Sequence, residues 1–159
     1  MSDDLNQLSF KTASHVGVTV KDLDRSIAFY KALSGRSPVV VDTLDSREMA
    51  ATAGWPTERE IRYATLRLEN LNIDLIELPW GHVPAVDGLS QTGRIHFSFL
   101  VEDLDDARLR LQDLGVDLKG PPYVMEGISE DVDRPSRFLY FQGPDGEILE
   151  LMEAHGRFC

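Results

Sequence analysis

Two stretches of the chain decide the fold, because they repeat one pattern. The first reads His15-Val-Gly-Val-Thr-Val-Lys-Asp-Leu-Asp24, and the second reads His96-Phe-Ser-Phe-Leu-Val-Glu-Asp-Leu-Asp105. The histidine, a valine and the Asp-Leu-Asp triplet stand at the same places in both stretches. A recurrence of this kind indicates that one supersecondary unit occurs twice along the chain.

Each copy begins with a strand that leads into a helix. Large apolar residues alternate with small or polar ones over residues 15–20 and 96–101, which is the period of a β-strand. Each histidine therefore lies on the strand face opposite the large apolar side chains. We expect the following helix to cover the face that lacks the histidine. Residues suited to cap and to end these helices follow in order: Asp22 or Asp24 with Gly35, and Asp103 or Asp105 with Gly115.

Each copy closes with two further strands joined by a turn. Apolar patterning predicts strands over 61–68 and 72–78, and over 137–141 and 147–152. The latter pair flanks Gly143-Pro-Asp-Gly146, a strong turn signal. Short strands expected over 38–42 and 116–119 complete the order βαβββ in both copies. The remaining segments are an insertion over 44–59 with a short helix expected near 49–55, a linker over 79–93 and a surface loop over 120–136.

The composition is that of a globular protein and excludes several classes of partner. The chain has 159 residues, of which 42% are hydrophobic and 27% charged, and its formal net charge is −11. That field repels phosphate backbones and anionic lipids, so we expect neither a nucleic-acid nor a membrane partner. Cys159 is the only cysteine, so there is no internal disulfide and no cysteine-ligated zinc site. Because no secretion signal or membrane span is evident, we expect a cytoplasmic protein of one domain, with modules at about 12–80 and 93–155.

Each copy supplies one histidine on its first strand and one glutamate on its last, which makes a set of four candidate metal ligands: His15, Glu77, His96 and Glu150. Glu77 is matched to Glu150 because Leu-Ile-Glu-Leu resembles Ile-Leu-Glu-Leu, while Asp74 is its rival on the opposite face of the same strand. A single strand histidine is more often a packing or surface residue, so the recurrence in both copies carries the prediction. Imidazole and carboxylate ligands suit Mn, Fe, Co, Ni or Zn.

These motifs resemble the vicinal oxygen chelate superfamily, which includes glyoxalase I, methylmalonyl-CoA epimerase, extradiol dioxygenases and bleomycin or fosfomycin resistance proteins. The resemblance rests on the two histidine strands, the two Asp-Leu-Asp triplets and Gly143-Pro-Asp-Gly-Glu-Ile-Leu-Glu150, and it covers residues 14–153. It implies an α+β fold in which two βαβββ modules form a half-open, barrel-like cleft around a divalent metal ion. His15, Glu77, His96 and Glu150 would occupy the ligand positions.

The resemblance also implies a reaction class. A divalent cation that grips two neighbouring substrate oxygens stabilises an enolate or enediolate. We therefore expect an epimerase- or glyoxalase-like isomerase or lyase that acts on a small carbonyl or acyl-thioester substrate. The base that moves the proton is left open between Glu77, Glu150 and a carboxylate outside the ligand set, Glu60.

Two other functions stay open. An Fe(II)-dependent extradiol-type dioxygenase is disfavoured, because such enzymes use three protein ligands and this chain offers four. A ligand-sequestering protein, like those that confer antibiotic resistance, would bind without a metal and stack its ligand on aromatic side chains: Trp55, Trp80, Tyr63 and Phe141. We expect a homodimer, since such symmetric pairs are the commonest assembly. The four ligands could come from one chain or from two.

Overall fold

The structure is a computed structural model that describes residues 13–45, 60–78, 95–125 and 134–155. The chain divides into two compact units, residues 1–82 and residues 83–159, and each is described by itself. In the part of the chain that the structure describes, no helix has the length and apolar character needed to cross a membrane.

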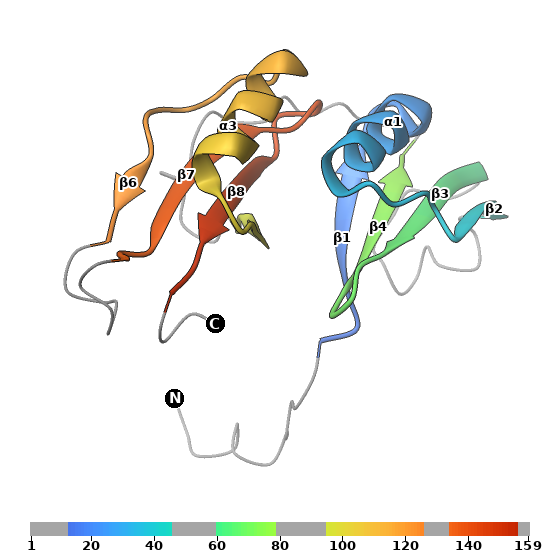
Figure 1. Ribbon diagram of the computed structural model, residues 1–159. Helices are drawn as coiled ribbons and strands as arrows, with labels where there is room; N and C mark the ends of the chain where they lie inside the picture. The colour runs from blue at the N-terminus through green and yellow to red at the C-terminus, as the bar shows by residue number, and fades with distance from the viewer. Residues whose placement is uncertain (1–12, 46–59, 79–94, 126–133, 156–159) are drawn as a thin grey trace, which may run out of the picture. The chain divides into compact units, whose positions relative to one another are not determined.

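Within its described residues, the first unit consists of a four-stranded sheet with the helix α1 against it (Figure 1). The strand order is β1-β4-β3-β2, in which β1 runs parallel to β4 and the other neighbours are antiparallel. Its elements, in chain order, are β1 (His15–Val20), α1 (Leu23–Ser34), β2 (Val40–Asp45), β3 (Glu60–Arg67) and β4 (Asn72–Glu77).

The second unit repeats this plan with the strand order β5-β8-β7-β6, and β5 is parallel to β8. Its elements are β5 (Phe97–Leu100), α3 (Leu104–Asp113), β6 (Tyr123–Val124), β7 (Arg137–Gln142) and β8 (Ile148–Glu153). The predicted α+β class and the repeated βαβββ order are therefore confirmed.

The helices begin and end at the residues that the sequence indicated. Asp22 caps α1 by accepting a hydrogen bond from the backbone N–H of Arg25 at 3.0 Å, and Asp103 caps α3 in the same way through Asp106 at 2.9 Å. Of the alternatives left open, the first aspartate of each triplet is thus the cap. Gly35 ends α1 with φ at 68°, a left-handed conformation that favours glycine.

Most of the hydrophobic core of each unit lies on the sheet face that the helix covers, while Ile61 of β3 and Ile148 of β8 are buried on the other face. In the first unit, Leu23 and Tyr30 of α1 are buried together with Ile73 and Leu75 of β4. In the second unit, the equivalent layer consists of Leu104, Leu111, Leu139, Leu149 and Leu151. Each fully buried side chain of this size contributes about 1.5–3 kcal/mol. We call the other face of each sheet, which is turned away from the helix, its open face.

Two short strands differ from the sequence-based prediction. The first begins two residues later than expected, at Val40. The prediction of a strand over 116–119 is wrong, because this segment makes only a single bridge, from Leu118 to Phe141. The strand that pairs with β7 is β6, which lies within the segment predicted to be a loop. Pro121 and Pro122 interrupt the pairing in between, because proline has no N–H to donate. The helix expected near 49–55 and the linker over 79–93 lie outside the described residues.

A charged cluster fixes α1 to the end of β4. The Glu77 side chain accepts hydrogen bonds from the backbone N–H of Leu23 at 3.0 Å and from Arg62 of β3 at 3.2 Å. Arg62 also donates to Asp24 in the first turn of α1 at 3.0 Å. We call this arrangement of a glutamate, an arginine and the helix start the helix clamp.

The second unit has its own helix clamp at the end of β8. Glu153 accepts hydrogen bonds from the backbone N–H of Leu104 at 2.9 Å and from Arg137 at 2.6 Å, and Arg137 also donates to Asp105 at 2.8 Å. Burial by itself raises the pKa of Glu153, but the hydrogen bonds from Leu104, Arg137 and His155 outweigh it and lower the pKa to about 2.

We predict that Glu153→Gln destabilises the protein by about 2–4 kcal/mol, because Arg137 is left partly buried without its full charge partner. The folded-state pKa of Glu153 lies below its ordinary value of 4.5. Its stabilising effect is therefore complete above pH 4.5 and is lost as the pH falls towards 2. Urea denaturation between pH 7 and pH 3 measures both effects. The exposed neighbour substitution Glu102→Gln serves as the control. An unchanged pH dependence in Glu153→Gln would contradict the assignment.

Candidate functional site

The strand register decides which polar residues share an open face. In the first unit, Gly17 pairs with Asp74 and Asp74 pairs with Thr65, so these three residues form one row across β1, β4 and β3. In the second unit, Ser98, Glu150 and Tyr140 form the equivalent row across β5, β8 and β7. His15 is the first residue of β1 and His96 directly precedes β5, so each row lies beside the histidine of its unit.

The first unit brings His15 next to Asp74. The Nε2 atom of His15 lies 3.8 Å from Oδ2 of Asp74, and the hydroxyl of Thr65 donates a hydrogen bond to Oδ1 of the same carboxylate at 2.7 Å. The other imidazole nitrogen, Nδ1, lies 3.1 Å from the hydroxyl of Ser14. One carboxylate oxygen and one imidazole nitrogen therefore face each other, while their other polar atoms are held by hydroxyl groups.

The second unit also places a histidine beside a carboxylate, which is here more buried and is held by a hydroxyl group from β5 rather than from the strand equivalent to β3. Nε2 of His96 lies 3.4 Å from Oε2 of Glu150, and the hydroxyl of Ser98 donates to Oε1 at 2.7 Å. The Glu150 side chain is 9% exposed, against 26% for Asp74. Burial raises the pKa of the Tyr140 hydroxyl, and its hydrogen bond to Glu150 and the charge of that carboxylate raise it further. The Tyr140 ring meets the imidazole of His96 edge-on at 5.3 Å.

The predicted equivalence of Glu77 and Glu150 is wrong. Asp74 pairs with Gly17 as Glu150 pairs with Ser98, so Asp74 is the structural counterpart of Glu150. Glu77 is instead the counterpart of Glu153, since each ends its strand and belongs to a helix clamp. Matching Leu-Ile-Glu-Leu to Ile-Leu-Glu-Leu therefore shifts the alignment of the two strands by three positions from their structural register. The arginines could have corrected it, because Arg62 and Arg137 each lie opposite a clamp glutamate.

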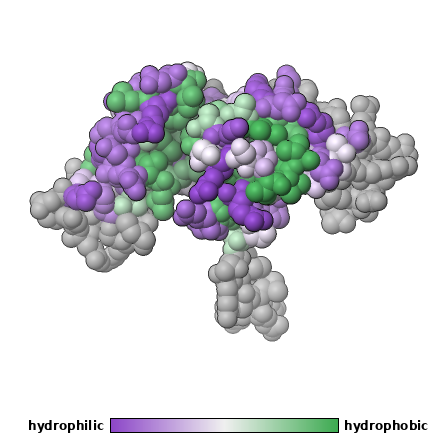
Figure 2. Space-filling view, turned by 45° about the vertical axis from the view of Figure 1, so that its right-hand side comes forward, coloured by the Kyte–Doolittle hydropathy of each residue, from purple (hydrophilic) through white to green (hydrophobic). Residues whose placement is uncertain are grey.

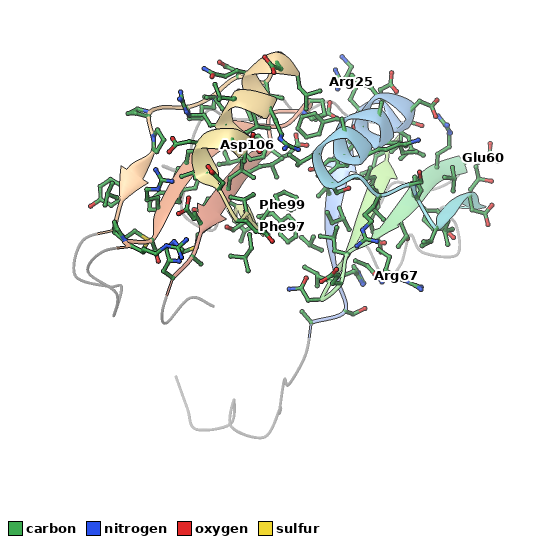
Figure 3. The ribbon with its side chains drawn as sticks, viewed as in Figure 1. Arg25, Glu60, Arg67, Phe97, Phe99 and Asp106 are labelled. Atoms are coloured by element: carbon green, nitrogen blue, oxygen red, sulfur yellow. The ribbon has the colours of Figure 1, made fainter. Side chains whose placement is uncertain are left out.

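The other residues predicted for the site fall in several places. Both oxygens of Glu77 are occupied on the helix side of the sheet, by Leu23 and Arg62. Glu60 is the exposed first residue of β3, and Figure 3 shows it at the opposite end of that strand from Arg67. Because Glu60 and Thr65 are an odd number of positions apart on one strand, they point to opposite faces.

The aromatic residues considered for ligand stacking are also separated. Tyr63 lies in the middle of β3, paired with Ile76, and therefore on the open face of the first unit. Phe141 is fully buried. Trp55 and Trp80 lie outside the described residues.

The chemistry of each pair suits a divalent cation, although neither pair is complete alone. Within residues 13–45, 60–78, 95–125 and 134–155, no three His, Cys, Asp or Glu side chains gather into a group that could hold a metal ion. Each unit by itself holds one imidazole beside one carboxylate. Borderline cations such as Mn²⁺, Fe²⁺ and Zn²⁺ accept both ligand types. The hydroxyl groups of Thr65 and Ser98 resemble the outer contacts that orient metal-binding carboxylates.

Comparison with known structures shows the same fold in several bacterial proteins. A glyoxalase family protein from Bacillus cereus is 20% identical with a TM-score of 0.77, and the match covers 94% of this chain and 98% of that one. A glyoxalase/bleomycin resistance protein/dioxygenase domain from Frankia is 25% identical with a TM-score of 0.64, over 92% and 94% of the two chains. The fosfomycin resistance protein FosX from Listeria monocytogenes is 20% identical with a TM-score of 0.61, over 92% and 95%.

No curated protein matches the chain. The family model described as the Glyoxalase/Bleomycin resistance protein/Dioxygenase superfamily matches residues 14–131, which is most of the sequence. Together with the repeated βαβββ units, this match establishes that the chain belongs to that superfamily, as the sequence motifs indicated.

Proposed function

We propose that the protein is a metal-dependent isomerase or lyase that moves a proton next to a substrate carbonyl. One observation carries the proposal: a histidine faces a carboxylate on the open face of each unit, with a hydroxyl group holding the other carboxylate oxygen. The core packed against each helix does not need such an arrangement, because the pairs lie on the opposite faces of the sheets. The structural neighbour FosX was crystallised with Mn(II) and sulfate, which supports a divalent cation as the cofactor to test.

The proposed ligands are His15, Asp74, His96 and Glu150. Asp74 replaces Glu77 in the set, because Asp74 faces His15 on the open face, whereas Glu77 lies on the helix side and binds Leu23 and Arg62 there. When bound, the cation supplies positive charge that stabilises an enolate oxygen. Thr65 and Ser98 orient the two carboxylates, and the nitrogen atoms of the histidines complete the donor set.

Glu150 is also the residue proposed to move the proton, through the carboxylate oxygen that would not hold the cation. It lies on the open face, in contrast to Glu77 and Glu60, which point to the helix side. Its surroundings are largely closed to water, which strengthens its interactions with a developing charge. Its hydrogen bonds with Ser98 and Tyr140 hold the carboxylate in one orientation. A proton taken from the carbon beside the carbonyl would return to the same carbon in an epimerase or to its neighbour in a glyoxalase-like reaction.

We predict opposite effects for two carboxylates of β4. Asp74→Asn should weaken Mn²⁺ binding at least about tenfold and leave the fold intact, because Asp74 lies on the open face. Glu77→Gln should retain Mn²⁺ binding but lower the free energy of unfolding by about 1–2 kcal/mol, because the helix clamp is weakened. Isothermal titration calorimetry and urea denaturation of both variants measure these effects. The reverse result would restore Glu77 to the ligand set.

The number of bound ions tests whether the two pairs act together. If both pairs bind one ion, purified protein holds one Mn²⁺ per chain, and His15→Ala or His96→Ala alone removes it. Metal analysis together with the molar mass in solution also tests the predicted homodimer, in which the pairs could come from two chains. Unchanged metal content in both histidine variants would overturn the proposed ligands.

We predict that the Mn²⁺-loaded protein exchanges solvent deuterium into the carbon beside the carbonyl of hydroxyacetone or an acyl-CoA ester. Removing the ion with a chelator should abolish the exchange, and Glu150→Gln should slow it at least about 100-fold. Proton NMR follows the loss of signal, with Glu147→Gln in the nearby turn as the control. Oxygen uptake with catechol and Fe(II), without any deuterium exchange, would instead favour the dioxygenase.

A further inference from the structure

A row of large apolar side chains lies directly beside the Ser98–Glu150–Tyr140 row of the second unit. The register pairs Leu100 with Met152, Met152 with Phe138 and Phe138 with Tyr123. All four side chains therefore lie on the open face, two positions along the strands from the carboxylate row. We call them the apolar row.

The apolar row is accessible and rich in aromatic rings. Tyr123 is 61% exposed and Leu100 is 66% exposed. The ring centroid of Phe138 lies 5.4 Å from that of Tyr123 and 5.4 Å from that of Tyr140. The Tyr140 ring in turn contacts the imidazole of His96. A continuous series of rings thus leads from the histidine to the exposed end of the sheet.

Exposed apolar residues that gather in one place mark binding surfaces more often than singly scattered ones do. Figure 2 shows that hydrophobic residues gather in patches between hydrophilic ones on the face it displays. The apolar row is distinguished among such surfaces by its direct contact, through Tyr140, with the proposed site.

The first unit does not repeat the apolar row. The equivalent positions hold Thr19, Ile76, Tyr63 and Asp42, which pair across β1, β4, β3 and β2. The duplication therefore keeps the histidine–carboxylate pair in both units but differs at the outer positions of the neighbouring row, which are the polar Thr19 and Asp42 in the first unit and the exposed Leu100 and Tyr123 in the second. The exposed apolar residue next to the first pair is instead Val40, which pairs with Thr65 at the edge of the carboxylate row. A requirement of folding common to both units does not explain this difference, whereas a ligand with one apolar end does.

We propose that the apolar row binds an aromatic substituent of the substrate, next to the oxygens held at the His96–Glu150 pair. This inference rests on the proposed function and adds a substrate class to it: small carbonyl compounds with a ring attached close to the chelated oxygens. Residues two positions apart on a strand are separated by about 7 Å, so the apolar row lies within reach of a ring bonded directly to such a carbonyl. Phe138 belongs to this row and is two positions from Tyr140, the partner of Glu150 on the neighbouring strand. Four side chains offer too little surface for a stable protein–protein interface, which buries about 1,000 Å² or more.

The test compares two neutral probes that share one chelating group. 2-Hydroxyacetophenone carries a phenyl ring where hydroxyacetone carries a methyl group, so the ratio of their dissociation constants isolates the ring. We expect the phenyl probe to bind the Mn²⁺-loaded protein about tenfold more tightly in calorimetry. Phe138→Leu and Tyr123→Ala should each reduce this ratio about three- to tenfold, while the binding of hydroxyacetone and of Mn²⁺ stays unchanged. Leu109→Ala, at an exposed apolar residue of α3, is the control.

The outcomes separate this inference from the proposed function. Equal binding of the two probes to a metal-loaded, proton-exchanging protein would overturn the apolar row as a binding site and leave the function intact. A phenyl preference that survives Phe138→Leu and Tyr123→Ala would likewise overturn it. A phenyl preference that depends on these two residues in a protein that neither binds Mn²⁺ nor exchanges protons would support the aromatic site and overturn the proposed function. Circular dichroism of each variant establishes that it is folded.

Discussion

The helix clamp is the interaction on which the rest of each unit depends. A carboxylate at the end of the central strand accepts the first free N–H of the helix, and an arginine from the next strand ties both to the helix's first turn. The N-terminal end of a helix carries unsatisfied N–H groups and partial positive charge, so a glutamate is well suited to this position. The handedness of the crossover between the parallel strands sets the face that the helix covers. The clamp then holds the start of the helix on that face, and the other face stays open for other chemistry.

Strand geometry then places the candidate site. Since side chains alternate along a strand, the residue three positions before a clamp glutamate points to the opposite face. That residue is Asp74 in one unit and Glu150 in the other, and each faces a histidine. The same strand thus supplies a structural carboxylate on one face and a candidate ligand on the other. The second unit holds both carboxylates in more buried surroundings, with Glu153 at 12% exposure against 22% for Glu77.

Most of the fold could be predicted from the sequence because its signals are local. The alternation of large apolar residues with small or polar ones predicted β1 and β5, and the Asp-Leu-Asp triplets predicted the helix starts. Gly143-Pro-Asp-Gly146 predicted the turn before β8. The strand register could not be read in the same way. Asp74 and Glu77 lie in similar local surroundings, and only their partners on β1 and β3 distinguish a site residue from a clamp residue. Likewise, the two-residue strand β6 is fixed by its pairing with β7 rather than by its own composition.

The duplication allows the open faces of the two units to change independently. Coordination chemistry would limit a pair of metal ligands to a few donor types, such as imidazole nitrogen and carboxylate oxygen. The hydroxyl group that orients the carboxylate is less restricted, since it comes from β3 in one unit and from β5 in the other. Neighbouring positions on the open face are not constrained by the core or by the ligands, so they are free to differ between the copies. The contrast between Thr19 and Leu100, or between Asp42 and Tyr123, lies at such positions. Differences between the copies therefore indicate where a substrate would be recognised, and similarities indicate where its reaction would occur.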